Sequence, residues 1–241
     1  MNAVAWFWLD EVSSTQDEAR ARLVSGVAGP LVVVATHQVA GRGRRGHVWQ
    51  SARGSSLTLT LAWPAPTLEA ASLAPLAVAL GAREGVLGVT GVDLSLKWPN
   101  DLESADGRKV GGVLLEACTV RGRSWLLAGI GLNVRLGSAP PGLPAASLED
   151  LGAAPPSPRV LETAIVVGAT TWLNRLSEPG VVLTAFAGVC STLGRPVGIV
   201  REGQLTLEGT AAGLGERGEL LVDVDGTRVA VTAGEVSVRS R

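Results

Sequence analysis

The chain keeps only two lysines, Lys97 and Lys109, among its 21 basic residues, and the other 19 are arginines. A coding bias that replaces lysine by arginine accounts for exposed positions, but it does not explain why both lysines lie in distinctive segments. Arginine cannot replace lysine where a reaction needs a compact ammonium point charge. Composition therefore nominates these two positions for chemistry.

A segment rich in glycine and arginine, residues 41–49 (GRGRRGHVW), is the sharpest local feature. It contains G-x-G-x-x-G, but a strand-like segment follows where a dinucleotide-binding turn requires a helix, and no Walker A motif occurs in the chain. The glycines let the backbone approach a ligand, while Arg42, Arg44 and Arg45 suit a carboxylate or a phosphate. Trp49 adds a flat apolar surface. A solvated loop or a minor nucleic-acid contact is the alternative for this segment alone.

Three further segments combine polar groups with a constrained backbone: 97–101 (KWPND), 109–116 (KVGGVLLE) and 129–134 (GIGLNV). The first is a rigid turn, because proline fixes its own φ and restricts the residue before it. The second places Lys109 beside two glycines at the start of a strand. The third has glycines alternating on one strand face, which leaves room for something to lie against the sheet beside Asn133. A structural turn or a tight sheet crossing explains each segment taken alone.

Taken together and in this order, these segments resemble the biotin protein ligases, the enzymes that biotinylate acetyl-CoA carboxylase. The matching pieces are SSTQ (13–16), HQVAGRGRRGHVW (37–49), KWPND (97–101), KVGGVLLE (109–116) and GIGLNV (129–134). The terminal stretch GRPV…GELLVDVDGTRVAV…GEVSVRS is similar to the family's SH3-like C-terminal domain. Each motif alone is weak, whereas five in the family's order are specific.

The resemblance implies a two-step reaction. The biotin carboxylate attacks the α-phosphate of MgATP to give biotinyl-5′-AMP and pyrophosphate, and a lysine of the biotin carboxyl carrier protein of acetyl-CoA carboxylase then attacks the acyl-adenylate. ATP and biotin are the substrates and Mg²⁺ accompanies ATP, with no particular Mg²⁺ ligands implied. The phosphoryl step needs cationic stabilisation more than covalent help, which arginine and lysine side chains supply.

The resemblance also assigns roles to individual residues. The implied catalytic residues are Lys109, Arg44 and Asp101. The implied biotin-binding residues are Ser14, Thr15, Gln38, Arg42, Gly111, Gly112 and Gly129. The implied ATP or adenylate contacts are Arg42, Arg44, Arg45, Trp49, Asn100, Lys109, Gly131 and Asn133. The chain departs from the family's usual pattern at Gln16 (commonly Asn), His47 (commonly Arg) and Val39 (commonly polar), and His47 lowers the charge of the loop near neutral pH.

Hydrophobic patterning supplies the elements that must position these residues. Strands are predicted at 4–9, 31–36, 56–61, 93–97, 110–117 and 125–134, with a helix that starts near 13–18 at a Thr15–Glu18 capping box and another around 73–80. A proline-rich irregular connection follows at 137–158, then two helices within 161–190. Five short strands after residue 195, with an Asp225-Gly226 hairpin, predict a small barrel.

These elements predict an α+β fold in two parts. The first is a mixed β-sheet flanked by helices over residues 1–192, which the resemblance identifies as a class II synthetase-like catalytic domain. The second is an SH3-like β-barrel over residues 193–241. The ligand-binding motifs begin at Ser13, which favours the monofunctional type without an N-terminal DNA-binding domain and hence no repressor role.

Composition limits the remaining classes of protein. The 241 residues are 46% hydrophobic and 18% charged, and the net charge of −1 argues against DNA as the main partner. The sequence has no basic leader that would predict secretion and no apolar run long enough to predict a membrane span. Cys118 and Cys190 do not have the spacing of metal ligands. We expect a cytoplasmic enzyme, with a homodimer as a further expectation from the resemblance. A lipoate ligase, a nucleic-acid-binding module and an inactive biotin-binding homologue are the competing interpretations.

Overall fold

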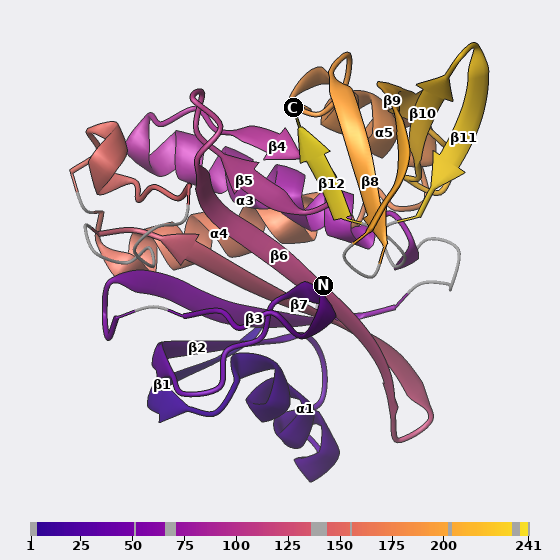
Figure 1. The fold of residues 1–241 in the computed structure, drawn as a ribbon. Coiled ribbons are helices and arrows are strands. Elements are labelled where there is room, and N and C mark those ends of the chain that lie inside the picture. The colour runs from indigo at the N-terminus through magenta and orange to yellow at the C-terminus, as the bar shows by residue number, and fades with distance from the viewer. Residues whose placement is uncertain are drawn as a thin grey trace.

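The computed structural model describes residues 4–50, 52–65, 71–135, 144–154, 156–201, 204–232 and 237–240. Its larger sheet has seven strands in the order β1-β2-β3-β7-β6-β5-β4 (Figure 1). Their bounds are β1 (Ala5–Val12), β2 (Leu31–Gln38), β3 (Ser56–Pro64), β4 (Ser95–Lys97), β5 (Asp101–Glu103), β6 (Lys109–Val120) and β7 (Arg123–Asn133). The sheet is mixed, as predicted, because β1 and β2 run parallel and the other neighbours are antiparallel.

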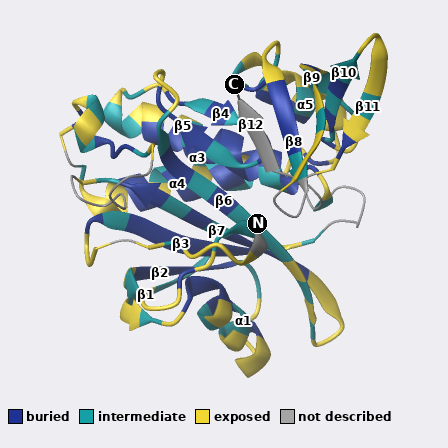
Figure 2. Ribbon diagram, in the orientation of Figure 1, coloured by how far each residue is buried: buried dark blue, intermediate teal, exposed yellow. Residues whose placement is uncertain are grey.

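Helices cover both faces of this sheet, which explains why its central strands are apolar throughout. Leu31 and Val33 of β2 pack towards α1 (Thr15–Ser25), whereas Val32 and Val34 join the larger core beneath α3 (Ala74–Thr90) and α4 (Pro158–Leu173). Alternate residues of one strand therefore enter two separate cores. Figure 2 shows the resulting buried centre of the sheet between these layers.

The first turn of α1 differs from the predicted capping box. Ser14 is the N-cap, and its hydroxyl accepts a hydrogen bond from the backbone N–H of Gln16. Thr15 is instead buried, with its hydroxyl engaged by the sheet. The cap therefore lies one residue earlier than predicted, and this turns Thr15 and Gln16 inward.

Two features of the larger sheet were not in the prediction. Strand β5 has only three residues, too few to show periodicity. It follows the turn at Pro99 and forms a hairpin with β4, in which Lys97 is the strand partner of Asp101. Strands β6 and β7 form a longer hairpin than expected, up to Val120 and from Arg123. Within the predicted irregular connection, the described residues include a short 3-10 helix, Glu149–Leu151.

The C-terminal part contains the five predicted strands after helix α5 (Pro179–Gly188). They are β8 (Pro196–Arg201), β9 (Gln204–Leu214), β10 (Leu220–Val224), β11 (Thr227–Val231) and β12 (Ser237–Ser240). The predicted hairpin joins β10 to β11, where Asp225 and Gly226 have φ values of 50° and 82°, as a two-residue turn requires. The predicted SH3-like arrangement of five strands is confirmed, although the sheet is not closed: in the order β11-β10-β9-β8-β12, the edge strands β11 and β12 do not pair with each other among the described residues.

The two parts share a continuous core, since Val197, Ile199 and Leu220 of the smaller sheet belong to the same buried cluster as α3. The division at residue 192 stays a prediction. No helix in the described part of the chain is long and apolar enough to span a membrane.

Candidate active site

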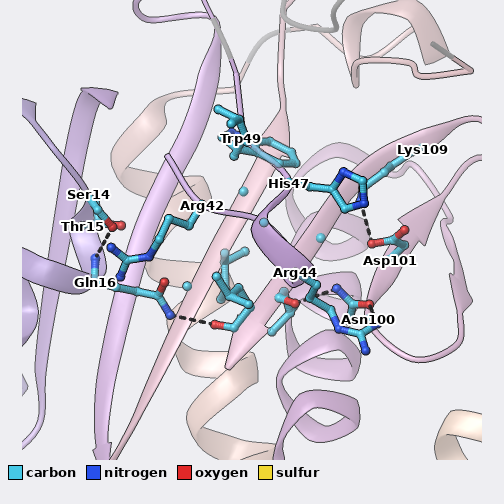
Figure 3. Close-up of a pocket in the computed structure, with 18 of the residues that line it drawn as sticks. Ser14, Thr15, Gln16, Arg42, Arg44, His47, Trp49, Asn100, Asp101 and Lys109 are labelled. Atoms are coloured by element: carbon cyan, nitrogen blue, oxygen red, sulfur yellow. Dashed lines mark hydrogen bonds and ion pairs between the residues drawn. The ribbon is translucent and has the colours of Figure 1, made fainter. Parts of the chain in front are cut away.

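A cavity of about 300 Å³ lies where the five motif segments of the sequence converge. It is lined by the start of α1, the loop 42–49, the turn 97–101 and the facing parts of β6 and β7. Figure 3 shows these side chains gathered around one space. The predicted residues that line it are Ser14, Thr15, Gln38, Arg42, Arg44, Trp49, Asn100, Asp101, Lys109, Gly112, Gly129 and Gly131.

One end of the cavity is neutral and polar. The backbone N–H and the hydroxyl of Thr15 both donate to Gln38 Oε1, at 2.8 and 3.0 Å. Thr60, buried in β3, donates from its hydroxyl to Thr15 Oγ1 at 2.9 Å. These hydrogen bonds hold Thr15 and Gln38, two of the predicted biotin-binding residues, in place. The neutral end suits an uncharged ligand group that forms hydrogen bonds.

Arg42 ties the loop to the body of the protein. Its guanidinium forms ion pairs with Asp17 of α1 at 2.6 Å and with Glu116 of β6 at 3.3 Å. The hydrogen bond to Asp17 is the largest cause that raises the pKa of Arg42 above its ordinary value. Arg20 also pairs with Glu116, at 3.1 Å. Carboxylates of the protein therefore hold this predicted ligand-binding cation.

Arg44 lies deeper, in a 3-10 turn (Arg44–Gly46). Its Nη1 donates to Asn100 Oδ1 at 3.1 Å, and Asn100 Nδ2 donates to the carbonyl of Val113 at 2.7 Å. The loop and the 97–101 turn are thus joined across the cavity (Figure 3). The side chain of Arg45, a third predicted contact of this loop, lies outside the described part of the chain.

Both lysines line the cavity, and each forms an ion pair with a carboxylate of strand β5. Lys109 Nζ lies 2.7 Å from Asp101 Oδ1, and Lys97 Nζ lies 3.1 Å from Glu103 Oε1. Glu103 is buried and also accepts a hydrogen bond from the Ser191 hydroxyl at 3.2 Å. The predicted catalytic pair of Lys109 and Asp101 is therefore in direct contact. Lys97 was singled out by composition and by its place in the 97–101 motif without an assigned role, and it lines the same cavity.

Charge in the cavity is mainly positive. Arg42, Arg44, Lys97 and Lys109 contribute cations to its wall, whereas Asp101 is the carboxylate among the residues that line it. Such a wall stabilises negative charge that develops on a bound carboxylate or phosphate. The site is therefore suited to anion activation at one end and neutral recognition at the other.

The glycines of β7 leave room for protein side chains. A Cβ on Gly129 would lie 3.2 Å from Gln16 Cδ, and one on Gly131 would lie 2.6 Å from Trp49 Cε2. The predicted space beside the alternating glycines is thus occupied by an amide and an indole. Sequence reasoning noted Gln16 only as a departure from the family pattern and missed it as a cavity residue. The signal that could have indicated a side chain here was the spacing of Gly129 and Gly131, two positions on one strand face that carry no side chain.

Two predicted contacts do not line the cavity. A Cβ on Gly111 would lie 2.7 Å from the carbonyl oxygen of Gly131, so Gly111 packs against the neighbouring strand. Asn133 is buried, and its Nδ2 donates to the carbonyl of Ala146 at 3.1 Å. The structure therefore places Asn133 as a link between β7 and the connection that follows it.

The described residues contain no cluster of three or more His, Cys, Asp or Glu side chains that could hold a metal ion.

The fold and the site define an enzyme that activates a carboxylate, with a cationic cavity on a mixed sheet and a small C-terminal sheet packed beside it. The chain belongs to the biotin/lipoate A/B protein ligase family, whose model matches residues 8–133, and the biotin protein ligase C-terminal domain matches residues 192–239.

Similar proteins agree with this assignment. The chain is 30% identical to a biotin–[acetyl-CoA-carboxylase] ligase of Mycobacterium tuberculosis, over 96% of this chain and 89% of that one. It is 31% identical to the enzyme of that name from Paracoccus denitrificans, over 95% and 98%. Among solved structures, the biotin protein ligase of Aquifex aeolicus in complex with biotin and ATP is 26% identical, with a TM-score of 0.81 over 98% of this chain and 99% of that one.

Proposed function

We propose that this chain is a biotin–protein ligase that forms biotinyl-5′-AMP from biotin and ATP and transfers the biotinyl group to a lysine of an acetyl-CoA carboxylase carrier protein. The observation that carries the proposal is the Lys109–Asp101 pair at 2.7 Å in a cavity that has a neutral polar end and a cationic end. The relatives named above, of similar length to this chain, support the substrates.

In the first half-reaction, a carboxylate oxygen of biotin attacks the α-phosphorus of ATP, and the bond from that phosphorus to the pyrophosphate oxygen breaks. The biotin carboxylate and the α-phosphate are both negatively charged. The protein must therefore neutralise their charge with groups that are already in position. Lys109 supplies a compact cation and Arg44 a forked one, beside the same turn. Asp101 and Asn100 hold these two cations in place through the contacts at 2.7 and 3.1 Å.

Mg²⁺ enters this scheme as part of the MgATP substrate. Bound in that form, the ion would neutralise part of the triphosphate charge. The cations of the cavity, Arg44 and Lys109 among them, would face the remaining negative charge.

In the second half-reaction, the neutral amine of the carrier lysine attacks the acyl carbon, the bond from that carbon to the phosphate oxygen of AMP breaks, and the new amide nitrogen loses a proton to solvent. The Asp101 carboxylate lies beside the reacting end, where it favours approach of a lysine side chain. Arg44 and Lys109 stabilise the phosphate of the leaving AMP. Trp49 packs on the adenylate in this scheme, and its contact with Gly131 at the cavity wall supports that role.

The carrier protein, a cytoplasmic location and a homodimeric assembly are the finer parts of the proposal. The names of the relatives support acetyl-CoA carboxylase as the source of the carrier. The expected location rests on the composition of the sequence, and the expected homodimer rests on the resemblance described above.

The test separates the two half-reactions. The purified chain is incubated with biotin and MgATP, the adenylate is isolated, and a biotin carboxyl carrier domain is then added. We expect biotinyl-AMP to accumulate without the carrier and one carrier lysine to become biotinylated with it. Modification of the carrier by lipoate instead of biotin would contradict the proposal.

A further inference from the structure

Four charged residues on the neighbouring strands β4, β5 and β6 form two diagonal ion pairs. Lys97 of β4 is the strand partner of Asp101 in β5. Lys109 of β6 is the strand partner of Glu103 in β5. In the ion pairs the carboxylates are exchanged, because Lys97 Nζ lies 3.1 Å from Glu103 Oε1 and Lys109 Nζ lies 2.7 Å from Asp101 Oδ1. Each lysine therefore pairs with the carboxylate that is not its strand partner.

The Asp101 carboxylate is also within reach of Lys97. Residues directly opposite each other in an antiparallel pair lie on the same face, with Cβ atoms about 4.5–5.5 Å apart, and diagonal neighbours are farther apart. Asp101 and Glu103 are two residues apart on one strand, so both carboxylates lie on that face. Strand geometry alone would thus favour a pair between Lys97 and the nearer Asp101.

The surroundings of Glu103 explain why Lys97 pairs with the more distant carboxylate. The side chain of Glu103 is 8% exposed, whereas that of Asp101 is 26% exposed. The Ser191 hydroxyl donates to Glu103 Oε2 at 3.2 Å, and the Ser191 backbone N–H donates to the carbonyl of Leu96 at 2.8 Å. A buried carboxylate that loses its cation is left with an uncompensated charge, whereas a more exposed one is partly solvated. Glu103 therefore binds Lys97 in preference to Asp101.

We infer that Glu103 is a positioning residue, which holds Lys97 away from Asp101 and so reserves the Asp101 carboxylate for Lys109. Lys97, Asp101 and Lys109 line the cavity, whereas Glu103 is not among its lining residues, so Glu103 acts through Lys97. Without the Glu103 carboxylate, Lys97 would turn to Asp101. Two ammonium groups would then compete for one carboxylate, and Lys109 would lose its fixed place beside the reacting groups.

The composition of the chain permits a direct test, because Lys97 and Lys109 are its only lysines. Lysine labelled with ¹⁵N at Nζ gives two ammonium signals in the NMR spectrum of the whole chain, and Lys97→Arg assigns them. Asp101→Asn provides the reference shift of the Lys109 signal when its carboxylate is lost. We expect Glu103→Gln to shift the Lys97 signal, and also to shift the Lys109 signal in the direction that Asp101→Asn does.

The adenylation rate gives a second readout, which rests on the proposed function and isolates the part played by Lys97. Glu103→Gln should lower the rate about tenfold or more, the scale for a small displacement of a catalytic group. Removal of the displaced lysine should reverse this loss. The double variant Glu103→Gln/Lys97→Gln should therefore match Lys97→Gln alone within about twofold, because the effects of residues in contact are not additive.

Two further variants separate positioning from folding. Glu162→Gln is the matched control, because Glu162 is 6% exposed like Glu103 and accepts a hydrogen bond from Trp8 Nε1 at 2.9 Å, outside the cavity lining. It should leave both lysine signals and the adenylation rate unchanged. Glu103→Asp replaces the glutamine variant if that variant does not fold. Its carboxylate is one methylene farther from Lys97, and it should shift both signals in the same directions by smaller amounts.

The outcomes are distinct. A Lys109 signal that stays at its wild-type position in the Glu103 variants would overturn the role of Glu103. A double variant whose loss of rate is the product of the two single losses would overturn it as well, since a packing defect at Glu103 persists without Lys97. Wild type that forms no adenylate from biotin and MgATP would instead refute the proposed function, and the two lysine signals would still test the positioning.

Discussion

Trp98 Nε1 donates a hydrogen bond of 2.8 Å to the carbonyl oxygen of Gly218, which links the 97–101 turn to the turn between β9 and β10. Trp98 is buried, and its backbone N–H donates to Thr192 Oγ1 at 2.9 Å. Asn100 and Asp101, which hold Arg44 and Lys109, follow two and three residues later. The small C-terminal sheet therefore supports the cationic end of the cavity.

We predict that Trp98→Phe slows adenylation several-fold while the KM for biotin changes less than twofold. Phenylalanine keeps most of the buried ring but leaves the Gly218 carbonyl without its donor, at a cost of about 1–3 kcal/mol. Steady-state kinetics with MgATP and biotin measure both parameters. Trp172→Phe is the matched control, because it removes an indole hydrogen bond of 2.9 Å to Glu84 outside the cavity lining. Equal rates for wild type and Trp98→Phe would exclude this support.

We predict that the loop 41–47 opens in the free protein and becomes protected when biotin and MgATP bind. Its ion pairs to Asp17 and Glu116 are partly exposed, and such pairs contribute only about 0–1 kcal/mol each. A bound carboxylate and phosphate add charge-assisted contacts to the same arginines. Limited proteolysis with and without ligands reports the difference. A cleavage rate that ligands do not change would contradict the prediction.

Arg44→Gly should leave the fold intact but release biotinyl-AMP faster. The guanidinium, held by Asn100 at 3.1 Å, is expected to contribute about 1.5–3 kcal/mol as a charge-assisted bond to the adenylate phosphate. The released intermediate then labels bystander lysines. Dissociation of the adenylate can be followed by rapid dilution. A dissociation rate equal to that of wild type would remove Arg44 from the site.

Lys109→Arg should lower the adenylation rate by about 10²-fold or more, the scale for loss of one preorganised electrostatic donor. Arginine keeps the charge but places a wide fork where Lys109 Nζ contacts Asp101 and lies 3.4 Å from the Cβ position of Gly112. Carrier biotinylation from supplied biotinyl-AMP should suffer less, because the phosphoryl step is bypassed. Adenylation at the wild-type rate would make Lys109 a structural residue.

The sequence predicted those parts of the structure that depend on local patterns. The apolar run of β2 and the Asp225-Gly226 turn were clear because strand burial and turn geometry select residue types directly. Strand β5 was missed because three residues carry no period. The five strands of the SH3-like part were predicted, but the sequence does not indicate whether they close, because pairing between β11 and β12, which is absent among the described residues, depends on long-range geometry rather than on either strand's pattern.

The site was predicted as a set of residues but not as a set of contacts. Arginine and glycine at 41–46 indicated an anion-binding loop, yet only the fold brings Asp17 and Glu116 to Arg42. In the same way, alternating glycines indicated room beside β7, whereas the orientation of α1 determines that Gln16 fills part of it.

The central claim is that this chain activates biotin as an acyl-adenylate. Exchange of labelled pyrophosphate into ATP tests it most directly, because exchange requires reversible formation of the adenylate and no carrier. We predict exchange that depends on biotin and is absent with lipoate or octanoate. Exchange with lipoate or octanoate but not with biotin would contradict the account.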